Sequence, residues 1–206
     1  MGIRERKERE KRDVRKRILE TAMKLFLEEG FEKVTIRRIA ETIEYSPAAI
    51  YLHFKDKDEI LYALHSEGFD ALYEQQMAIL SIKDPLKRLR THGEIYLTFA
   101  LDKPEYYDLM FIMRNPAKKI KEQKAWDIGL RSYEFLRKNV QDCMDAGVLP
   151  KADADVATFS LWAHVHGMAS LIIRGRCIMF PEEHIRDIVK GALEFMMKKL
   201  LNSQKP

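Results

Sequence analysis

The sequence predicts an all-α protein of about nine helices, arranged as a short three-helix N-terminal domain followed by a larger helical domain. In nearly every segment apolar residues recur at three- and four-residue steps, the period of an amphipathic helix. Glycine (9 of 206 residues) and proline (7) are scarce, whereas a turn-rich β protein needs both. The 46% of apolar residues is sufficient for a hydrophobic core.

The first helix is expected at roughly residues 10–29. Val14, Ile18 and Ala22 lie on one apolar stripe, and Gly30 is a favourable residue just past a helix end. The residues before it are rich in arginine and lysine but also contain acidic residues, so they form a basic arm of mixed sign. This arm is either a solvated helix end or a segment that touches nucleic-acid phosphate or a minor groove.

Two short helices with a tight break between them follow the first helix. Thr35 is a suitable N-cap for one, while Ser46 and Pro47 suit the cap and first position of the other, which is expected to end near Phe54. The break is expected at residues 44–45. A helix, a tight break and a short second helix make a helix-turn-helix arrangement.

The rest of the chain repeats the same pattern. Asp56 and Glu59 resemble a capping box, and proline or aspartate stands at the start of the later helices. Pro116 and Gly147 mark breaks. The further helices are expected at about residues 56–80, 84–101, 104–113, 118–146, 153–175 and 181–201.

Several function classes are disfavoured by the sequence. The two cysteines, Cys143 and Cys177, lack metal-ligand spacing, and no signal peptide is visible, so we expect reduced thiols in a cytoplasmic protein. The apolar run 161–173 is too short to span a bilayer and is expected to be a buried helix. No catalytic motif is present, so we expect neither an enzyme nor a cofactor.

The second short helix has small side chains on the face expected to be exposed. Ser46, Pro47, Ala48 and Ala49 would let its backbone approach base edges and thymine methyl groups in a DNA major groove. Tyr51 and His53 are expected to project outward at the same end, while Ile50 and Phe54 face the core. The N-terminal domain is therefore a candidate reader of double-stranded DNA.

Residues 12–64 resemble the N-terminal domain of the TetR/AcrR family of transcription regulators. The resemblance is carried by residues 35–40 (TIRRIA) and 45–61 (YSPAAIYLHFKDKDEIL), most strongly by 50–61. In the second half, Trp162, His166 and Gly167 resemble the tryptophan-histidine-glycine C-terminal domain of a subset of the family.

The resemblance implies roles for individual residues. Arg37 would reach a base edge or a phosphate at the groove edge, and the four small residues of the second short helix would face the bases. The residues implied to hold backbone phosphates are Thr35, Tyr51, His53 and Lys57. Phosphate contacts fix the register of the protein on DNA, whereas base contacts give sequence preference.

Glu44 departs from the family pattern, which places glycine in this turn. A non-glycine residue at positive φ costs roughly 1 kcal/mol, so we expect a slightly reshaped turn and a retained fold. The small face at Ala48 and Ala49 gives few polar base contacts. Sequence preference would then rest partly on Arg37 and on DNA shape.

Aromatic and methionine side chains are concentrated between residues 84 and 174. Any one of them is read most simply as core, but together they favour a cavity for an apolar or aromatic ligand between helices. The residues chosen as candidate lining are Tyr96, Phe99, Met110, Trp126, Tyr133, Trp162 and His166. The spacing of His164 and His166 puts them on different helix faces, so we expect no metal site.

The last two helices are apolar and rich in small residues, and the family dimerises through them. A symmetric pair would present two recognition helices to a pseudo-palindromic operator. We therefore predict a DNA-binding domain at residues 1–57 and a ligand-binding and dimerisation domain at 58–206. The function expected is a homodimeric repressor released by a small molecule. The alternative is a ligand-independent activator or an architectural or partner-binding DNA protein.

Overall fold

The computed structural model describes residues 2–113 and 127–202, and within them it contains nine α-helices and no strand, as the sequence predicts. The described residues divide into two compact units. One unit comprises residues 2–68 and 108–113, and the other comprises residues 69–107 and 127–202. Each unit has its own hydrophobic core.

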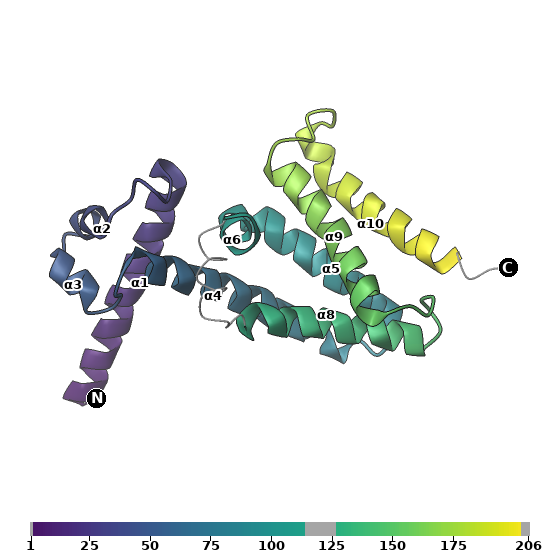
Figure 1. Ribbon diagram of the computed structural model, residues 1–206, viewed down its shortest axis with the longest axis horizontal. Helices are drawn as coiled ribbons and strands as arrows, with labels where there is room; N and C mark the ends of the chain where they lie inside the picture. Colours follow the sequence, from purple (N-terminus) through teal and green to yellow (C-terminus); the bar gives the residue numbers. More distant parts are fainter. Residues whose placement is uncertain (1, 114–126, 203–206) are drawn as a thin grey trace. The chain divides into compact units, whose positions relative to one another are not determined.

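The first unit contains α1 (Ile3–Glu29), α2 (Ile36–Thr42), α3 (Pro47–Tyr51), the first half of α4 (Lys57–Met77) and the π-helical turn η2 (Asp108–Ile112) (Figure 1). Apolar side chains from all of these elements meet in one core, whose fully buried members include Ile18, Ala22, Val34, Ile39, Ala40, Ile50 and Ile60. Helix α3 is only five residues long, and a helix of that length is not stable alone. Its stability therefore depends on this core, which holds it in place.

Helix α1 begins at Ile3, seven residues earlier than the sequence pattern predicts. Residues 4–13 are all exposed, so no tertiary packing supports this part of the helix. Two other factors favour it: arginine, lysine and glutamate have high helix propensity, and ion pairs span one turn, such as Arg6–Glu10 at 2.8 Å. The apolar stripe that predicts this helix covers only its packed part, so the exposed first part of α1 is missing from the prediction.

The second unit contains the rest of α4, the 3-10 turn η1 (Ala78–Ser81), α5 (Pro85–Asp102), α6 (Pro104–Tyr107), α8 (Asp127–Asp145), α9 (Ala154–Ile173), the 3-10 turn η3 (Glu182–His184) and α10 (Ile185–Asn202). Helix α5 packs against α8, α9 and α10 (Figure 1). Gly93 permits the contact with α10, because a Cβ atom there would lie 3.3 Å from Cδ1 of Leu193.

Three expected elements differ in detail from the structure. The helix expected at 104–113 is α6 followed by the π-helical turn η2. The long helix expected at 118–146 is described only from Asp127, where α8 begins, and residues 118–126 lie outside the described residues. The last helix begins at Ile185 rather than at Pro181, because the 3-10 turn η3 precedes it.

Helix α9 is not the buried helix that the sequence predicts. Val156, Phe159 and Leu171 are 63%, 61% and 53% exposed in the single chain, and Phe195 on the neighbouring α10 is 65% exposed. By length and composition α9 could also cross a membrane, a weak criterion that core helices of soluble proteins meet too. An apolar run predicts that a helix is shielded from water, but it does not indicate which other surface shields it.

A buried histidine links three helices of the second unit. Nδ1 of His92 on α5 lies 2.9 Å from the Asn139 amide nitrogen on α8, and Nε2 lies 2.9 Å from the Gln76 amide on α4. Arg88 donates from Nε to Oδ1 of Asn139, so Asn139 must offer its NH2 group to His92. The ring proton therefore resides on Nε2, where the atom at 2.9 Å is the Gln76 amide nitrogen, a second donor. Turning the Gln76 amide by 180° would bring Oε1 to this proton and give that otherwise unsatisfied buried oxygen a partner.

We expect His92 to make stability depend on pH. Burial lowers its pKa from the ordinary 6.5 to about 4, so between these values the unfolded chain binds more protons than the folded one. Stability contributed by His92 is then complete above pH 6.5 and is lost as the pH falls toward 4. Between pH 7 and pH 5 the loss is about 2 kcal/mol. Urea unfolding of wild type and His92→Gln at both pH values measures it.

His92→Gln should destabilise the protein at pH 7. Between pH 7 and pH 5 the unfolding free energy of the variant should decrease less than that of wild type. His65 also has a pKa lowered to about 4 by burial, so some pH dependence should remain in the variant. His184 is exposed, and His184→Gln is the control that should keep the wild-type slope. Parallel pH profiles for wild type and His92→Gln would contradict the assignment.

Candidate functional site

Helices α2 and α3 are joined by a tight turn, and a hydroxyl group caps the N-terminus of each helix. Oγ1 of Thr35 accepts a hydrogen bond from the backbone nitrogen of Arg38 (3.1 Å), and Oγ of Ser46 accepts one from the backbone nitrogen of Ala49 (3.2 Å). Glu44 has a φ of 60°, the only positive value at a non-glycine residue in the described ranges. The turn therefore retains its helix-turn-helix geometry with the strain expected at Glu44.

Helix α3 presents the small face that the sequence predicts. Ser46, Pro47 and Ala48 are exposed and Ala49 is half-buried, whereas Ile50 is fully buried. Tyr51 at the end of the helix is 57% exposed. A short helix with this exposed surface can approach the base edges in a major groove without large side chains holding it away.

Two cations expected at the interface have different surroundings. Arg37 on α2 is exposed and pairs through Nε with Oε1 of Glu41 at 2.9 Å, a surface contact weak enough to be exchanged for a phosphate or a base. Lys57 is the first residue of α4, but its Nζ donates to the backbone oxygen of Phe31 at 2.6 Å and lies 4.2 Å from the centre of that ring. Lys57 therefore stabilises the turn after α1.

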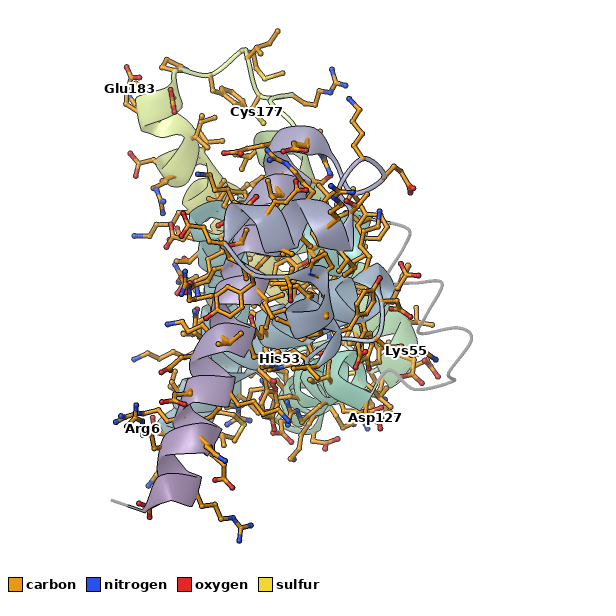
Figure 2. All side chains as sticks on the ribbon, turned by 90° about the vertical axis from the view of Figure 1, so that its left-hand side faces the viewer. Arg6, His53, Lys55, Asp127, Cys177 and Glu183 are labelled. Atoms are coloured by element: carbon orange, nitrogen blue, oxygen red, sulfur yellow. The ribbon has the colours of Figure 1, made fainter. Side chains whose placement is uncertain are left out.

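His53 lies between α3 and α1 and is only partly exposed (Figure 2). Its Nδ1 is buried and has no hydrogen-bond partner among the described residues. Burial lowers the pKa of His53, and the positive charges of Lys11 and Arg15 lower it further. The side chain is thus a neutral group in a positive environment, where an added phosphate would be favourable.

Lys11 and Arg15 lie close to the end of α3, and the family resemblance does not assign a role to either residue. Arg15 stacks its guanidinium 4.3 Å from the centre of the Phe54 ring and so lies at the end of α3. The basic arm was the signal in the sequence, but the helical structure of the arm decides which of its cations lie near α3.

In the second unit, four aromatic side chains converge. Nδ1 of His166 on α9 lies 3.0 Å from the hydroxyl oxygens of both Tyr96 on α5 and Tyr107 on α6, and the Tyr107 hydroxyl also donates to the His166 backbone oxygen at 3.0 Å. Nε1 of Trp162 donates to the Tyr96 hydroxyl at 3.4 Å. We call these four residues the aromatic cluster.

One tautomer of His166 satisfies three of the four polar contacts of the aromatic cluster, all except the one between the Tyr107 hydroxyl and Nδ1. If Tyr107 donates to the backbone oxygen and Tyr96 donates to Nδ1, His166 carries its proton on Nε2. Burial raises the pKa of Tyr96 well above 10 and lowers the pKa of His166, so both of these side chains are neutral at pH 7. A neutral, partly buried polar group between rings can orient an uncharged aromatic or apolar molecule.

The structure brings together only part of the predicted ligand set. Tyr96, Trp162 and His166 belong to the aromatic cluster, and Tyr133 packs edge-on against Trp162 with ring centres 6.4 Å apart. Aromatic composition does not single out Tyr107 as a lining residue, although Tyr107 and Tyr106 form an aromatic pair in the sequence. The remaining three are Phe99, buried on α5; Met110, which falls in the first unit; and Trp126, which lies outside the described residues.

Within the described residues, no group of three or more histidine, cysteine or acidic side chains is placed to hold a metal ion. Cys143 is buried and its pKa is raised to about 11 by burial, so it remains a thiol at pH 7.

Comparison with known families agrees with this description. Residues 18–64 match the family described as bacterial regulatory proteins of the tetR family, and residues 89–196 match the tetracyclin repressor-like C-terminal domain. The second match alone covers more than half of the chain. The likeness of Trp162, His166 and Gly167 to the tryptophan-histidine-glycine subset is tested by neither match and stays a prediction.

Individual relatives show how far the similarity extends. The chain is 43% identical over 58 residues to an HTH-type transcriptional repressor of Mycobacterium tuberculosis, a match that spans 28% of this chain and only 31% of the relative. It is 28% identical over 178 residues to the HTH-type transcriptional regulator AcrR of Shigella flexneri, covering 81% of this chain and 75% of that protein.

A solved structure shares the fold over nearly the whole length. It is the TetR family transcriptional regulator PfmR of Thermus thermophilus, which superimposes with a TM-score of 0.66 at 24% identity and covers 92% of this chain and 99% of that one. The helix-turn-helix geometry, the two family matches and this shared architecture agree, and the chain belongs to the TetR family of bacterial regulatory proteins.

Proposed function

We propose that the protein is a transcription repressor that binds a pseudo-palindromic DNA operator as a homodimer and is released by a small apolar or aromatic molecule. One observation carries the proposal: α3 is held by the core of its unit with Ser46, Pro47 and Ala48 exposed. The relatives named a repressor and a regulator support the same activity.

In this proposal α3 enters the major groove and the flanking residues hold the DNA backbone. Ser46, Pro47, Ala48 and Ala49 face the bases, and Arg37 exchanges its Glu41 partner for a base edge or phosphate. Tyr51 and His53 hold phosphates. Thr35 contacts a phosphate through a hydroxyl that already caps α2, and Lys57 uses the ammonium hydrogen not directed at the backbone oxygens of residues 31 and 32.

The homodimer would form through α9 and α10. Both helices expose large apolar side chains, among them Phe159 and Phe195, which a partner would remove from water. A Cβ atom on Gly167 or Gly191 would meet nothing within 4 Å in the single chain, so packing inside the chain does not require glycine at either position. Small residues there would instead allow the helices of a second copy to approach closely.

The effector would bind at the aromatic cluster. Tyr96, Trp162 and His166 lie on two different helices, α5 and α9, so a molecule between them would change how these helices pack. Such a change alters DNA affinity only if the ligand prefers one arrangement of the two recognition helices.

The proposal assigns DNA binding to residues 1–57 and both ligand binding and dimerisation to residues 58–206. It places the protein in the cytoplasm and gives it no catalytic role.

The proposal is tested by selecting bound duplexes from a random DNA pool with the full-length protein. We expect enrichment of an inverted repeat whose half-sites lie about one helical turn apart, and a mass of two chains by light scattering. A panel of uncharged aromatic and acyl compounds should include some that release the duplex. Enrichment without any releasing compound favours a ligand-independent regulator, and no enriched sequence at low salt refutes DNA regulation.

A further inference from the structure

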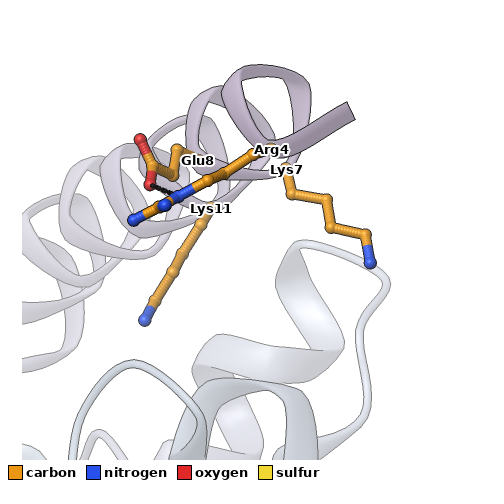
Figure 3. A pocket seen from close by; sticks show the side chains of 4 residues that line it. All are labelled: Arg4, Lys7, Glu8 and Lys11. Atoms are coloured by element: carbon orange, nitrogen blue, oxygen red, sulfur yellow. Dashed lines mark hydrogen bonds and ion pairs between the residues drawn. The ribbon is translucent and has the colours of Figure 1, made fainter. Parts of the chain in front are cut away.

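The N-terminal part of α1 carries several of its cations on one face of the helix. Arg4, Lys7, Lys11 and Arg15 are spaced by three or four residues and therefore lie on one face. We call this face the basic stripe. Figure 3 shows Lys7 and Lys11 extending from the same side of α1, where they line a hollow together with Arg4 and Glu8.

The basic stripe continues the face by which α1 packs on its own unit. Further along the same face lie Ile18 and Ala22, both fully buried in the core. At Val14 the burial becomes partial, and from residue 13 back to residue 4 every side chain is exposed. The face that contacts protein in the second half of α1 thus faces open space in the first half, and its apolar residues are replaced there by cations.

The cations of the stripe are largely uncompensated by acidic neighbours. Arg4 lies 3.4 Å from Glu8 in a fully solvated contact, while Lys7 and Lys11 make no ion pair among the described residues. On other faces of the same helix some cations are paired, as in Arg6–Glu10 at 2.8 Å and Lys16–Glu20 at 3.6 Å. Arg6 extends away from α1 into open space (Figure 2). The net positive charge is therefore concentrated on the side of α1 that carries the stripe.

The stripe ends beside the DNA-reading helix. The Arg15 guanidinium stacks on Phe54 just past α3, and the charges of Lys11 and Arg15 act on His53. From Arg4 to Arg15 the stripe extends about 16 Å along the helix axis. Over that distance a DNA duplex presents on the order of ten phosphate charges.

We propose that the basic stripe is a helical DNA-backbone clamp that binds phosphates flanking the base pairs read by α3. This inference rests on the proposed DNA-binding function and extends it, because the family match begins only at residue 18 and the stripe precedes it. Contacts to phosphates carry no sequence information, so the stripe adds affinity and operator length but no base preference.

The test compares two triple variants that lose the same charge from opposite faces of α1. Arg4→Gln, Lys7→Gln and Lys11→Gln together remove three of the four cations of the stripe, while Arg6→Gln, Arg9→Gln and Lys16→Gln remove three cations from the opposite side. All six side chains are exposed, so both variants should keep the wild-type helix content and unfolding midpoint. The probe is the duplex enriched by wild type, extended by random flanks, and the readout is affinity as a function of salt.

For each phosphate released, the slope of log affinity against log salt falls by about 0.9. With two chains bound we expect the stripe variant to lose a slope of about 3 or more and roughly 10- to 100-fold in affinity, with its protected footprint shortened at both ends. The opposite-face variant should lose a slope below about 1. The base preference of both should equal that of wild type.

Equal slopes and footprints for the two variants would overturn the clamp while leaving operator recognition by α3 intact. A changed base preference in the stripe variant would overturn the assignment to phosphates, since it would mean that the arm reads bases. Absence of any enriched duplex with wild type would refute the proposed function itself, which is a separate outcome.

Discussion

Ala48→Glu should weaken binding to the selected operator at least about 100-fold, which corresponds to about 3 kcal/mol. Ala48 is exposed at the second position of α3, so in the proposed complex its side chain faces the base edges. Glutamate there would place a charge among phosphates and base acceptors and would hold the helix away from the groove, and like charges brought together cost several kcal/mol. Band shift against the operator and against a scrambled duplex measures the change.

The protein itself should tolerate Ala48→Glu. A carboxylate near a helix N-terminus is favourable, and the site is solvated, so the unfolding midpoint should not fall. Ala152→Glu is the matched control, because Ala152 is an exposed alanine in the second unit and gains the same charge. Operator binding that survives Ala48→Glu at wild-type strength would show that α3 does not approach the bases.

Arg88→Met should destabilise the protein by about 4 kcal/mol, the largest effect on stability expected from replacing one polar residue. Arg88 is only 13% exposed and donates three hydrogen bonds: to Oδ1 of Asn139 (2.8 Å), to the backbone oxygen of Ile82 (2.9 Å) and to Oδ2 of Asp142 (2.6 Å). Methionine fills a similar volume but removes the donor to the Asn139 carbonyl and to Oδ2 of Asp142, whose Oδ1 keeps only the contact with Lys138 at 2.9 Å. Urea unfolding at one fixed protein concentration measures the loss.

Two further variants define the origin of the effect. Arg88→Lys should recover little of the loss, because an ammonium group cannot reproduce three hydrogen bonds in the planar arrangement of a guanidinium. Arg186→Met removes a solvated ion pair with Asp102 and should change stability by less than about 1 kcal/mol. If Arg88→Met and Arg186→Met cost the same, the buried network would have no special role.

Ala48 and Arg88 show that the sequence predicts local features of the first unit but not the long-range contacts of the second. Ala48 was identified from the sequence because a short capped segment repeats a local pattern: Ser46 caps, Pro47 starts the helix and Ile50 faces inward. Every one of these features depends on neighbours within a few residues. The importance of Arg88 depends on Asn139 and Asp142, more than fifty positions away, and no local pattern reports such a partner.

The candidate ligand residues show the same limit. Aromatic composition selects Tyr96, Trp162 and His166, which the structure brings together. It also selects Phe99, which is buried on α5, and it omits Tyr107, whose hydroxyl completes the cluster. Residue type shows which side chains suit an apolar site. Only the crossing of α5, α6 and α9 determines which of them share it.

The sequence by itself determined the helical class, the caps and breaks of α2 and α3 and the family resemblance, because these follow from periodicity and contacts between near neighbours. Tertiary structure alone decided that α9 leaves apolar side chains exposed, that His92 and Arg88 join α5 to α8, and that Lys57 is held by backbone oxygens. It also placed Arg15 against Phe54 and so aligned the stripe with α3. Burial and ion pairing depend on which distant segments pack together, and the sequence of a single helix does not show which segments those are.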